Sequence, residues 1–185
     1  MSQIFTAIIL ITLGILTRTV FHIGPNFEFV TAISLIAGYM FTSKKIAMAV
    51  PFTIMFVSDS IIGNTNIFLF TWSAYLLMPF IGGVLKRFKT NNRLKKIMAL
   101  EGTGILSVLM FYFWTNAGVV ITTNMYSKDL VGLVTSYINA LPFLKPQLLG
   151  VLLTVPIIYI LVILAQKLVF KREFDIHTGI KKLLV

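Results

Sequence analysis

Cysteine is absent from the 185-residue sequence, which excludes disulfide bonds, thiol catalysis, iron–sulfur clusters and cysteine-ligated zinc. Charged residues are scarce: they make up 12% of the chain, whereas a soluble domain carries about 25%. The HExxH, GxSxG and Walker A motifs are also missing. The sequence therefore predicts no catalytic residue, no metal site and no resident cofactor, and it indicates that the chain cannot use ATP by itself.

What the sequence has in abundance is apolar side chains. They form 57% of the residues and include 16 phenylalanines, and the mean hydropathy is +0.92. This composition excludes a disordered chain and argues strongly against a water-soluble enzyme. It predicts an all-α integral membrane protein whose outer surface contacts membrane lipid.

Six stretches are apolar and approach the roughly 20 residues that a membrane-crossing helix needs. They are residues 3–21, 27–42, 46–62, 67–85, 97–115 and 147–170. The first stretch lacks the basic start and the small-residue cleavage site of a secretory signal, so we interpret it as a span. We expect a single six-helix transmembrane domain over residues 1–185, with a basic cytoplasmic tail at 171–185.

The distribution of lysine and arginine predicts which side of the membrane each connection faces. Alternate connections and the C-terminal tail carry 13 of the 16 basic residues, and the other side carries Arg18, Lys128 and Lys145. By the positive-inside rule, the strongly basic side is cytoplasmic. Both termini are then cytoplasmic, in a bacterial cytoplasmic membrane. A nucleic-acid partner is not expected, because Phe88 is the only aromatic residue in the basic run at 86–96.

The outward-facing segment between the fifth and sixth stretches contains a short helical pattern. After Asp129, which is suited to an N-cap, apolar residues recur at intervals of three and four as far as Leu141. Small and polar residues occupy the opposite face, and we expect Pro142 to end the helix. This amphipathic 129–143 helix is too short to span a membrane, so we expect it at the outer interface or over the mouth of the bundle.

Hydrogen-bonding side chains collect at the outer ends of the predicted spans, where ionisable groups are costly and commonly mark functional sites. Arg18 and Asp59 are expected at similar depth, so they either pair with each other or bind a polar ligand. The alternative for the whole set is a structural role in ion pairs, turns and the aromatic belt. The residues expected to bind a small solute are Arg18, His22, Asn26, Asp59, Asn64, Tyr75, Trp114, Asn116 and Tyr126.

Small residues on the second and third stretches permit another helix to approach closely. Packing within the chain is one interpretation of this pattern, and docking of another membrane subunit is the other. The candidate docking residues are Ala32, Ala37, Gly38, Ala47 and Ala49.

Several of these residues belong to a longer series, which comprises Arg18, His22, Pro25-Asn26-Phe27, Gly38, Pro51, Ser58-Asp59, Gly63, Tyr75, Gly83, Phe113, Thr115-Asn116, Gly118, Tyr126, Gly132, Tyr137 and Leu141-Pro142-Phe143. Over roughly residues 18–150, this series resembles a family of small, functionally uncharacterised bacterial membrane proteins. That family in turn is similar in size, number of spans and topology to the substrate-binding S-components of energy-coupling-factor (ECF) vitamin transporters.

The resemblance implies an S-component-like membrane subunit that captures a vitamin or a related heterocycle at its outer face. In S-components the first three helices meet a transmembrane coupling subunit, which two cytoplasmic ATPases drive. The Ala-x-x-x-Ala signature of many S-component first helices is absent from residues 2–21, so a solitary transporter or a different partner is an alternative. An accessory subunit without its own ligand and a small membrane enzyme are the other functional hypotheses.

Overall fold

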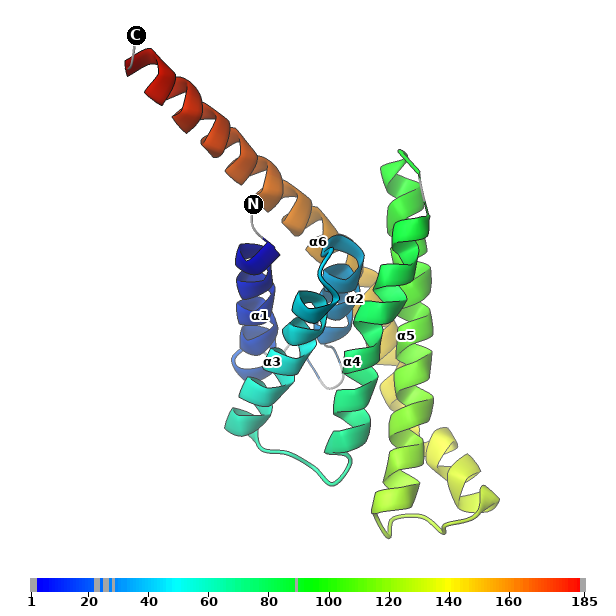
Figure 1. Cartoon of the computed structure of the whole chain (residues 1–185). Coiled ribbons are helices and arrows are strands. Elements are labelled where there is room, and N and C mark those ends of the chain that lie inside the picture. Colours follow the sequence, from blue (N-terminus) through cyan, green and yellow to red (C-terminus); the bar gives the residue numbers. More distant parts are fainter. Residues whose placement is uncertain (1–2, 22–23, 25–26, 28, 89, 184–185) are drawn as a thin grey trace.

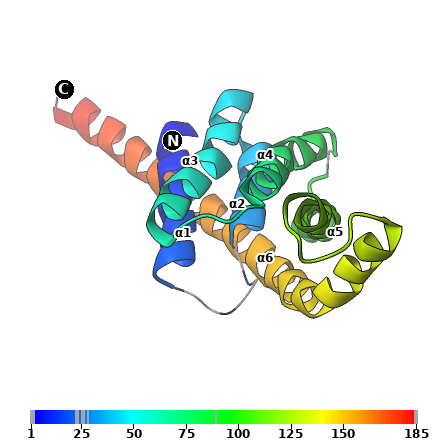
Figure 2. The ribbon, with the colours of Figure 1, turned by 90° about the horizontal axis from the view of Figure 1, so that it is seen from below.

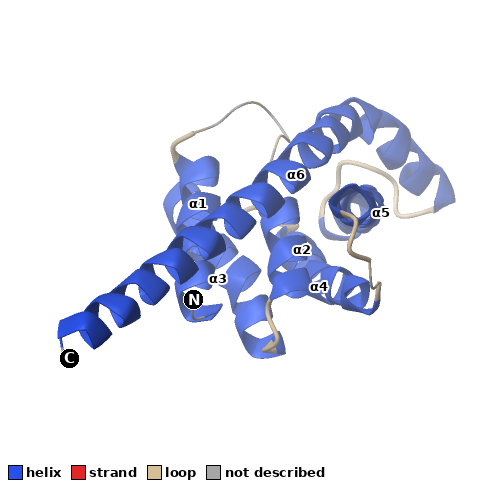
Figure 3. Cartoon of the chain, turned by 90° about the horizontal axis from the view of Figure 1, so that it is seen from above, coloured by secondary structure: helices blue, strands red, loops and turns tan. Residues whose placement is uncertain are grey.

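The computed structural model describes residues 3–21, 24, 27, 29–88 and 90–183, with side chains through residue 167. Its helices are α1 (Gln3–Thr19), α2 (Val30–Met40), α3 (Lys44–Ile62), α4 (Phe68–Val84), α5 (Arg93–Thr122) and α6 (Leu130–Leu183), and a 3₁₀ turn, η1 (Leu85–Arg87), follows α4 (Figure 1). Every regular element in the described ranges is helical, as Figure 3 shows, and this confirms the predicted all-α fold class.

Four helical segments of the described chain are long and apolar enough to cross a membrane. They are Lys44–Ile62, Phe68–Arg87, Arg93–Thr122 and Leu130–Lys167. The helices α1 and α2 are apolar but shorter, with 17 and 11 residues. This make-up is that of a multi-pass membrane protein with four long candidate spans and two shorter apolar helices.

Successive helices run in alternating directions, so the connections gather at two opposite ends of the bundle (Figure 1). One end holds the start of α1, the α2–α3 connection and the α4–α5 connection, and we call it the upper end, as in Figure 1. The α3–α4 and α5–α6 connections lie at the lower end. Alternate connections therefore lie at opposite ends of the bundle, as the sequence predicts.

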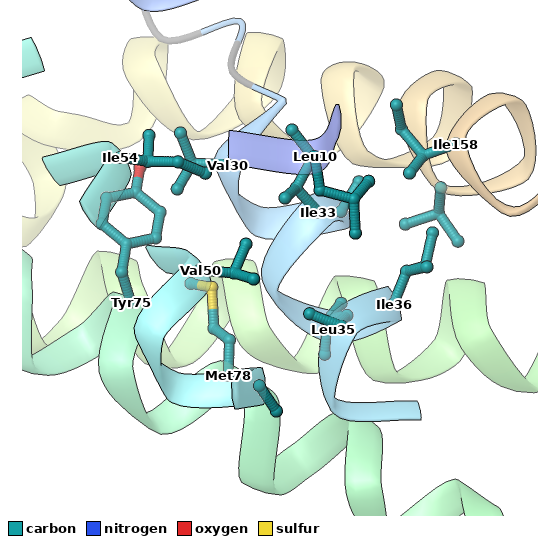
Figure 4. Close-up of a cluster of buried hydrophobic side chains, with 14 of the residues drawn as sticks. Leu10, Val30, Ile33, Leu35, Ile36, Val50, Ile54, Tyr75, Met78 and Ile158 are labelled. Atoms are coloured by element: carbon teal, nitrogen blue, oxygen red, sulfur yellow. The ribbon is translucent and has the colours of Figure 1, made fainter. Parts of the chain in front are cut away.

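The short helix α2 forms the centre of the bundle. It is apolar on all sides, the pattern of an enclosed helix, and every residue from Val30 to Gly38 is buried. It contacts each of the other five α-helices. Figure 4 shows its side chains among those of the surrounding helices, which include Leu10, Val50, Ile54, Met78 and Ile158. A helix of this length is therefore a core element shielded by its neighbours.

The helices α2 and α4 cross with their backbones in contact. A Cβ atom added at Gly38 would lie 2.0 Å from the carbonyl oxygen of Pro79, and one added at Gly82 would lie 2.0 Å from that of Leu35. Any side chain at either glycine would overlap the opposite backbone, which is why small residues are needed at this crossing.

The predicted end of the outer helix at Pro142 is wrong, because α6 continues as one helix through Pro142, Pro146 and Pro156 to Leu183. A proline inside a helix removes one backbone hydrogen bond and crowds the preceding turn, which bends a helix without necessarily ending it. Figures 1 and 2 show the first part of α6, in yellow, running at an angle to the rest. We call residues 130–141 the α6 arm.

Candidate functional site

Arg18 and Asp59 form an ion pair between α1 and α3, which confirms the pairing considered from the sequence. Arg18 Nη2 donates to Asp59 Oδ1 at 2.8 Å, and Trp72 Nε1 of α4 donates to Asp59 Oδ2 at 2.7 Å. Arg18 Nη1 lies 2.6 Å from Met55 Sδ. The two charged side chains are 12% and 8% exposed, so each charge would be costly here without its partner.

Aromatic rings close this region, which we call the ion-pair cluster (Arg18, Met55, Asp59 and Trp72). Three phenylalanines pack edge-on against Trp72, with ring centroids 5.9 to 6.4 Å away, namely Phe52, Phe56 and Phe68. Both oxygens of the Asp59 carboxylate accept a hydrogen bond. Within the described residues, Arg18 Nε is the cluster's one buried side-chain nitrogen or oxygen without a partner. The cluster therefore satisfies most of its own polar groups.

A second polar region at the same end surrounds a cavity of about 510 Å³, which we call the lower cavity. This volume lies within the roughly 300–1,000 Å³ that is usual for small-molecule sites. No lining residue carries a charge. The lining comes from the α3–α4 connection, the first turn of α4, α5, the α5–α6 connection and α6. It consists of Thr65, Ile67, Thr71, Phe111, Tyr112, Thr115, Asn116, Val119, Met125, Tyr126, Ser136, Asn139, Ala140, Phe143 and Gln147.

Helical periodicity places these side chains on two facing surfaces. The α5 residues of the lining are spaced i, i+1, i+4, i+5 and i+8 from Phe111 to Val119, which is one face of a helix. The α6 residues are spaced i, i+3, i+4, i+7 and i+11 from Ser136 to Gln147, which is again one face. Two helices that each present a mixed polar and aromatic face thus form the walls of the lower cavity.

Hydrogen bonds hold the α6 arm against α5 beside the cavity. Ser136 Oγ donates to the Asn116 carbonyl at 3.3 Å, and the Tyr137 hydroxyl donates to the Phe113 carbonyl at 3.3 Å. The Tyr112 hydroxyl donates in the opposite direction, to the Tyr137 carbonyl. These three bonds connect the α6 arm to the α5 wall of the cavity.

The α6 arm turns small residues towards the protein and large apolar ones outward. Gly132, Ser136 and Ala140 are buried, whereas Leu130 is 73% exposed and Ile138 is 59% exposed. Outward apolar side chains on an amphipathic helix suit the boundary between headgroups and acyl chains. Of the polar face predicted for the 129–143 segment, Ser136 and Asn139 reach the lower cavity, whereas Thr135 is exposed.

Asn116, in the α5 wall of the lower cavity, keeps hydrogen-bonding capacity for a ligand. Its Nδ2 donates to the Tyr112 carbonyl at 2.8 Å, and an asparagine side chain has two N–H donors and one carbonyl oxygen. One N–H and the oxygen are thus left over within the described contacts. On the α6 side, Asn139 Nδ2 donates to the Tyr126 hydroxyl at 3.4 Å. Amides and a phenol therefore meet at this cavity.

Asp129 begins α6 in the capping role that the sequence predicts. Its Oδ1 accepts hydrogen bonds from the Gly132 amide and from the Ser127 hydroxyl, both at 2.8 Å. These bonds, the one from Gly132 foremost, hold the pKa of the carboxyl below its usual 3.8, because they favour the charged form. The cap secures the start of the α6 arm.

The structure separates the predicted solute-binding residues. Asn116 and Tyr126 line the lower cavity, whereas Arg18 and Asp59 belong to the ion-pair cluster. Tyr75 is buried in the core, and its ring centroid lies 5.0 Å from that of Phe111 in the cavity wall. Tyr75 thus supports the wall from behind.

Two other predicted residues do not line the lower cavity. Asn64 is exposed in the α3–α4 connection and accepts a hydrogen bond from the Thr65 amide at 2.9 Å. Trp114 is 46% exposed on α5, where its Nε1 donates to Ser73 Oγ at 2.9 Å. The remaining two, His22 and Asn26, lie outside the described residues.

Four of the five candidate docking residues are enclosed by the chain itself. Ala32 and Ala37 are 0% exposed, Ala47 is 4% exposed, and Gly38 is buried against the α4 backbone. In this conformation these four residues pack within the chain, and their use as a docking surface stays a prediction. Ala49 is exposed on α3.

Comparison with protein families gives one match, to a family of unknown function that covers residues 1–173 of this chain. The chain belongs to the DUF6580 family. No curated protein and no solved structure is significantly similar to it. The family match covers both the ion-pair cluster and the lower cavity, so both lie within the part of this DUF6580 member that characterises the family.

Several cavity residues of this DUF6580 member escaped the sequence interpretation, among them Tyr112, Ser136, Asn139 and Gln147. The available signal was periodicity. A polar and aromatic stripe from Phe111 to Val119, and a second from Ser136 to Gln147, each follow helical spacing. That these stripes face each other across a space was not visible in the sequence.

Proposed function

We propose that this protein is a substrate-binding membrane protein that captures a small, uncharged organic solute in the lower cavity. The observation that carries the proposal is the lining: amides, hydroxyls and aromatic rings surround about 510 Å³, and no lysine, arginine, aspartate or glutamate is among them. An apolar cavity with a few placed polar groups is the usual form of a small-molecule site.

The lining favours a flat heterocycle with hydrogen-bonding substituents, such as a vitamin or a related compound. Phe111 and Tyr126 offer ring faces, and the Asn116 amide offers both a donor and an acceptor. A charged solute would enter a membrane protein without a counter-charge in its site, which is costly. The proposed solute is therefore neutral.

The proposal has the lower cavity open to the outside of a bacterial cytoplasmic membrane. The upper end carries Lys44 at the start of α3 and Lys86 and Arg87 in η1, and the positive-inside rule assigns such a basic end to the cytoplasm. Capture at the outer face then makes the protein part of an uptake system.

In this proposal the α6 arm controls access to the cavity. The arm lines the cavity through Ser136 and Asn139, and Pro142 and Pro146 follow it directly. A helix that lacks backbone hydrogen bonds at a bend moves there more easily than elsewhere. Movement of the arm about this bend would open and close the site.

Energy for uptake has to come from outside this chain if ATP drives it, because the sequence has no nucleotide-binding motif. The resemblance to ECF S-components supports a transmembrane coupling subunit with two cytoplasmic ATPases as the partner. Of the five candidate docking residues, Ala49 is the one whose exposure fits such a contact.

Ligand binding by the purified protein tests the proposal. The probes are the neutral vitamins riboflavin, pyridoxine and nicotinamide, with thiamine and biotin as charged comparisons, and mass spectrometry identifies any compound that co-purifies. We expect a neutral compound to raise the melting temperature, and charged compounds to leave it unchanged.

A pair of matched variants locates the binding. Asn116→Ala should weaken binding by about 10-fold, which corresponds to about 1.4 kcal/mol for a lost hydrogen bond. Asn64→Ala removes the same side chain outside the cavity and should leave binding unchanged. Equal losses in both variants, or tighter binding of the charged compounds, would refute the proposed site.

A further inference from the structure

A second cavity, of about 460 Å³, lies at the upper end between α2, α3 and α4. We call it the upper cavity. It is separate from the lower cavity, with which it shares no lining residue. Its walls are Gly38, Phe41, Thr42, Lys44, Ala47, Met48, Pro79, Phe80, Gly83, Val84, Lys86 and Arg87.

The upper cavity carries positive charge that its own lining does not neutralise. Lys44, Lys86 and Arg87 belong to the lining, and no aspartate or glutamate does. Lys44 and Lys86 are close enough to repel each other electrostatically. The one ion pair found among the described residues is that of the ion-pair cluster at the lower end. Three cations at one cavity mouth therefore lack an anionic partner within the described chain.

The position of Lys86 is set by the protein backbone. Its Nζ donates to the carbonyl of Phe41, the residue that caps the end of α2. A cation at a helix C-terminus is favourable, because the last carbonyls and the helix dipole attract it. This contact holds one positive charge at the cavity instead of letting it extend freely into solvent.

Apart from Thr42, the rest of the lining is apolar, and it reaches exposed apolar residues on the surface of the bundle. Phe80 and Val84 of α4 are 46% and 64% exposed, and Met48 lines the cavity on α3. One helical turn further along α3, Phe52 is 48% exposed. An apolar path thus leads from the cationic mouth along the two helices towards the middle of the bundle.

We infer that the upper cavity binds an anionic phospholipid, with the headgroup phosphate between Lys44, Lys86 and Arg87 and an acyl chain beside Phe80 and Met48. The charges would attract the phosphate, and the adjoining exposed apolar residues would contact the chain. Basic pockets between membrane helices on the cytoplasmic side are suited to anionic headgroups. The lipid site does not rest on the proposed solute binding, since it uses other residues at the other end of the molecule.

Native mass spectrometry of the full-length protein tests this inference, with phosphatidylglycerol as the anionic probe and phosphatidylcholine as the zwitterionic one. We expect retention of phosphatidylglycerol in preference to phosphatidylcholine by at least about 10-fold, at about 1 kcal/mol for each basic residue involved. Equal retention of the two lipids would overturn the inference.

The variant Lys44→Gln/Arg87→Gln should abolish most of that preference. It keeps Lys86 and its contact with Phe41, and it removes a cation from the first turn of α3, where the helix dipole disfavours one. The matched control is Arg93→Gln/Lys95→Gln, which lowers the charge equally at the same end but outside the cavity. An equal loss in the control would mean diffuse attraction to the basic surface and would contradict a site.

Inorganic phosphate distinguishes a lipid from a free anion. At millimolar concentration it should leave the bound phosphatidylglycerol in place, because it has no acyl chain to contact Phe80 and Val84. Displacement of the lipid by phosphate alone, with phosphate retained in its stead, would make the upper cavity an anion site and overturn the assignment to a phospholipid.

Discussion

The ion-pair cluster and the lower cavity lie at the same end of the bundle, and they use their polar residues in opposite ways. In the cluster, the Asp59 carboxylate accepts hydrogen bonds from Arg18 and Trp72, and three phenylalanine rings pack against Trp72. In the cavity, the Asn116 amide keeps donor and acceptor capacity beside an open volume of about 510 Å³.

The difference shows that a polar residue in an apolar helix has two distinct ways to be tolerated. A charged residue such as Asp59 needs its partners inside the protein, because no other arrangement offsets the loss of water. A neutral amide such as Asn116 is tolerated beside a space that a solute or water can occupy. The charged residues therefore lie in the closed ion-pair cluster, and neutral polar residues line the open lower cavity.

The strongest test of the closed region is Asp59→Ala. Removing one partner leaves Arg18 as an unpaired, largely buried charge, so we expect a loss of about 3 kcal/mol in the free energy of unfolding. The double variant Arg18→Met/Asp59→Leu removes both charges and should lose much less. Thermal unfolding in detergent measures both, and a double variant as unstable as Asp59→Ala would show that the pair is not what stabilises the cluster.

The next largest effect is expected at the α2–α4 crossing. Gly82→Ala places a methyl group 2.0 Å from the Leu35 carbonyl oxygen, and overpacking of this kind costs about 1–3 kcal/mol. Gly102→Ala is the matched control, since nothing lies within 4 Å of its added Cβ and alanine favours the helix. Comparable stability of the two variants would contradict the close crossing.

A larger residue in the open region should be tolerated. Ala140→Leu adds three carbons towards the lower cavity, so we expect a smaller loss of stability than that of Gly82→Ala, together with weaker binding of the neutral solute. Thermal unfolding and the binding assay measure the two effects separately. A loss of stability as large as that of Gly82→Ala would mean that the cavity is filled by the protein's own side chains.

The smallest effect is expected at the Asp129 cap. The folded pKa lies below the usual 3.8, so the cap contributes stability above that pH, and the contribution is lost as pH falls through the folded pKa. The protection of the Gly132 amide against hydrogen exchange, taken relative to the intrinsic rate at each pH, should fall over that pH range in the wild type. In Asp129→Asn, which keeps the acceptor without its charge, that fall in protection should be absent. The same fall in both proteins would show that Asp129 is not its cause.

Much of the fold was predictable because it depends on local pattern. The apolar stretches and the Asp129 cap follow from residue type and spacing, whereas the Arg18–Asp59 pair was one of two alternatives that the sequence left open. The continuation of α6 through Pro142 was not predictable, since a proline either ends or bends a helix and the surrounding contacts decide which. The role of Gly38 was not predictable either, because only the structure shows that the α4 backbone lies against it.

The sequence by itself determined that this is a helical membrane protein and which of its residues are too polar to face lipid. Tertiary structure alone decided that Asp59 is enclosed and that Asn116 borders a space. The physical reason is that burial and cavity volume depend on how helices distant in the sequence pack together. Side-chain periodicity within one helix gives no information about which helix faces it.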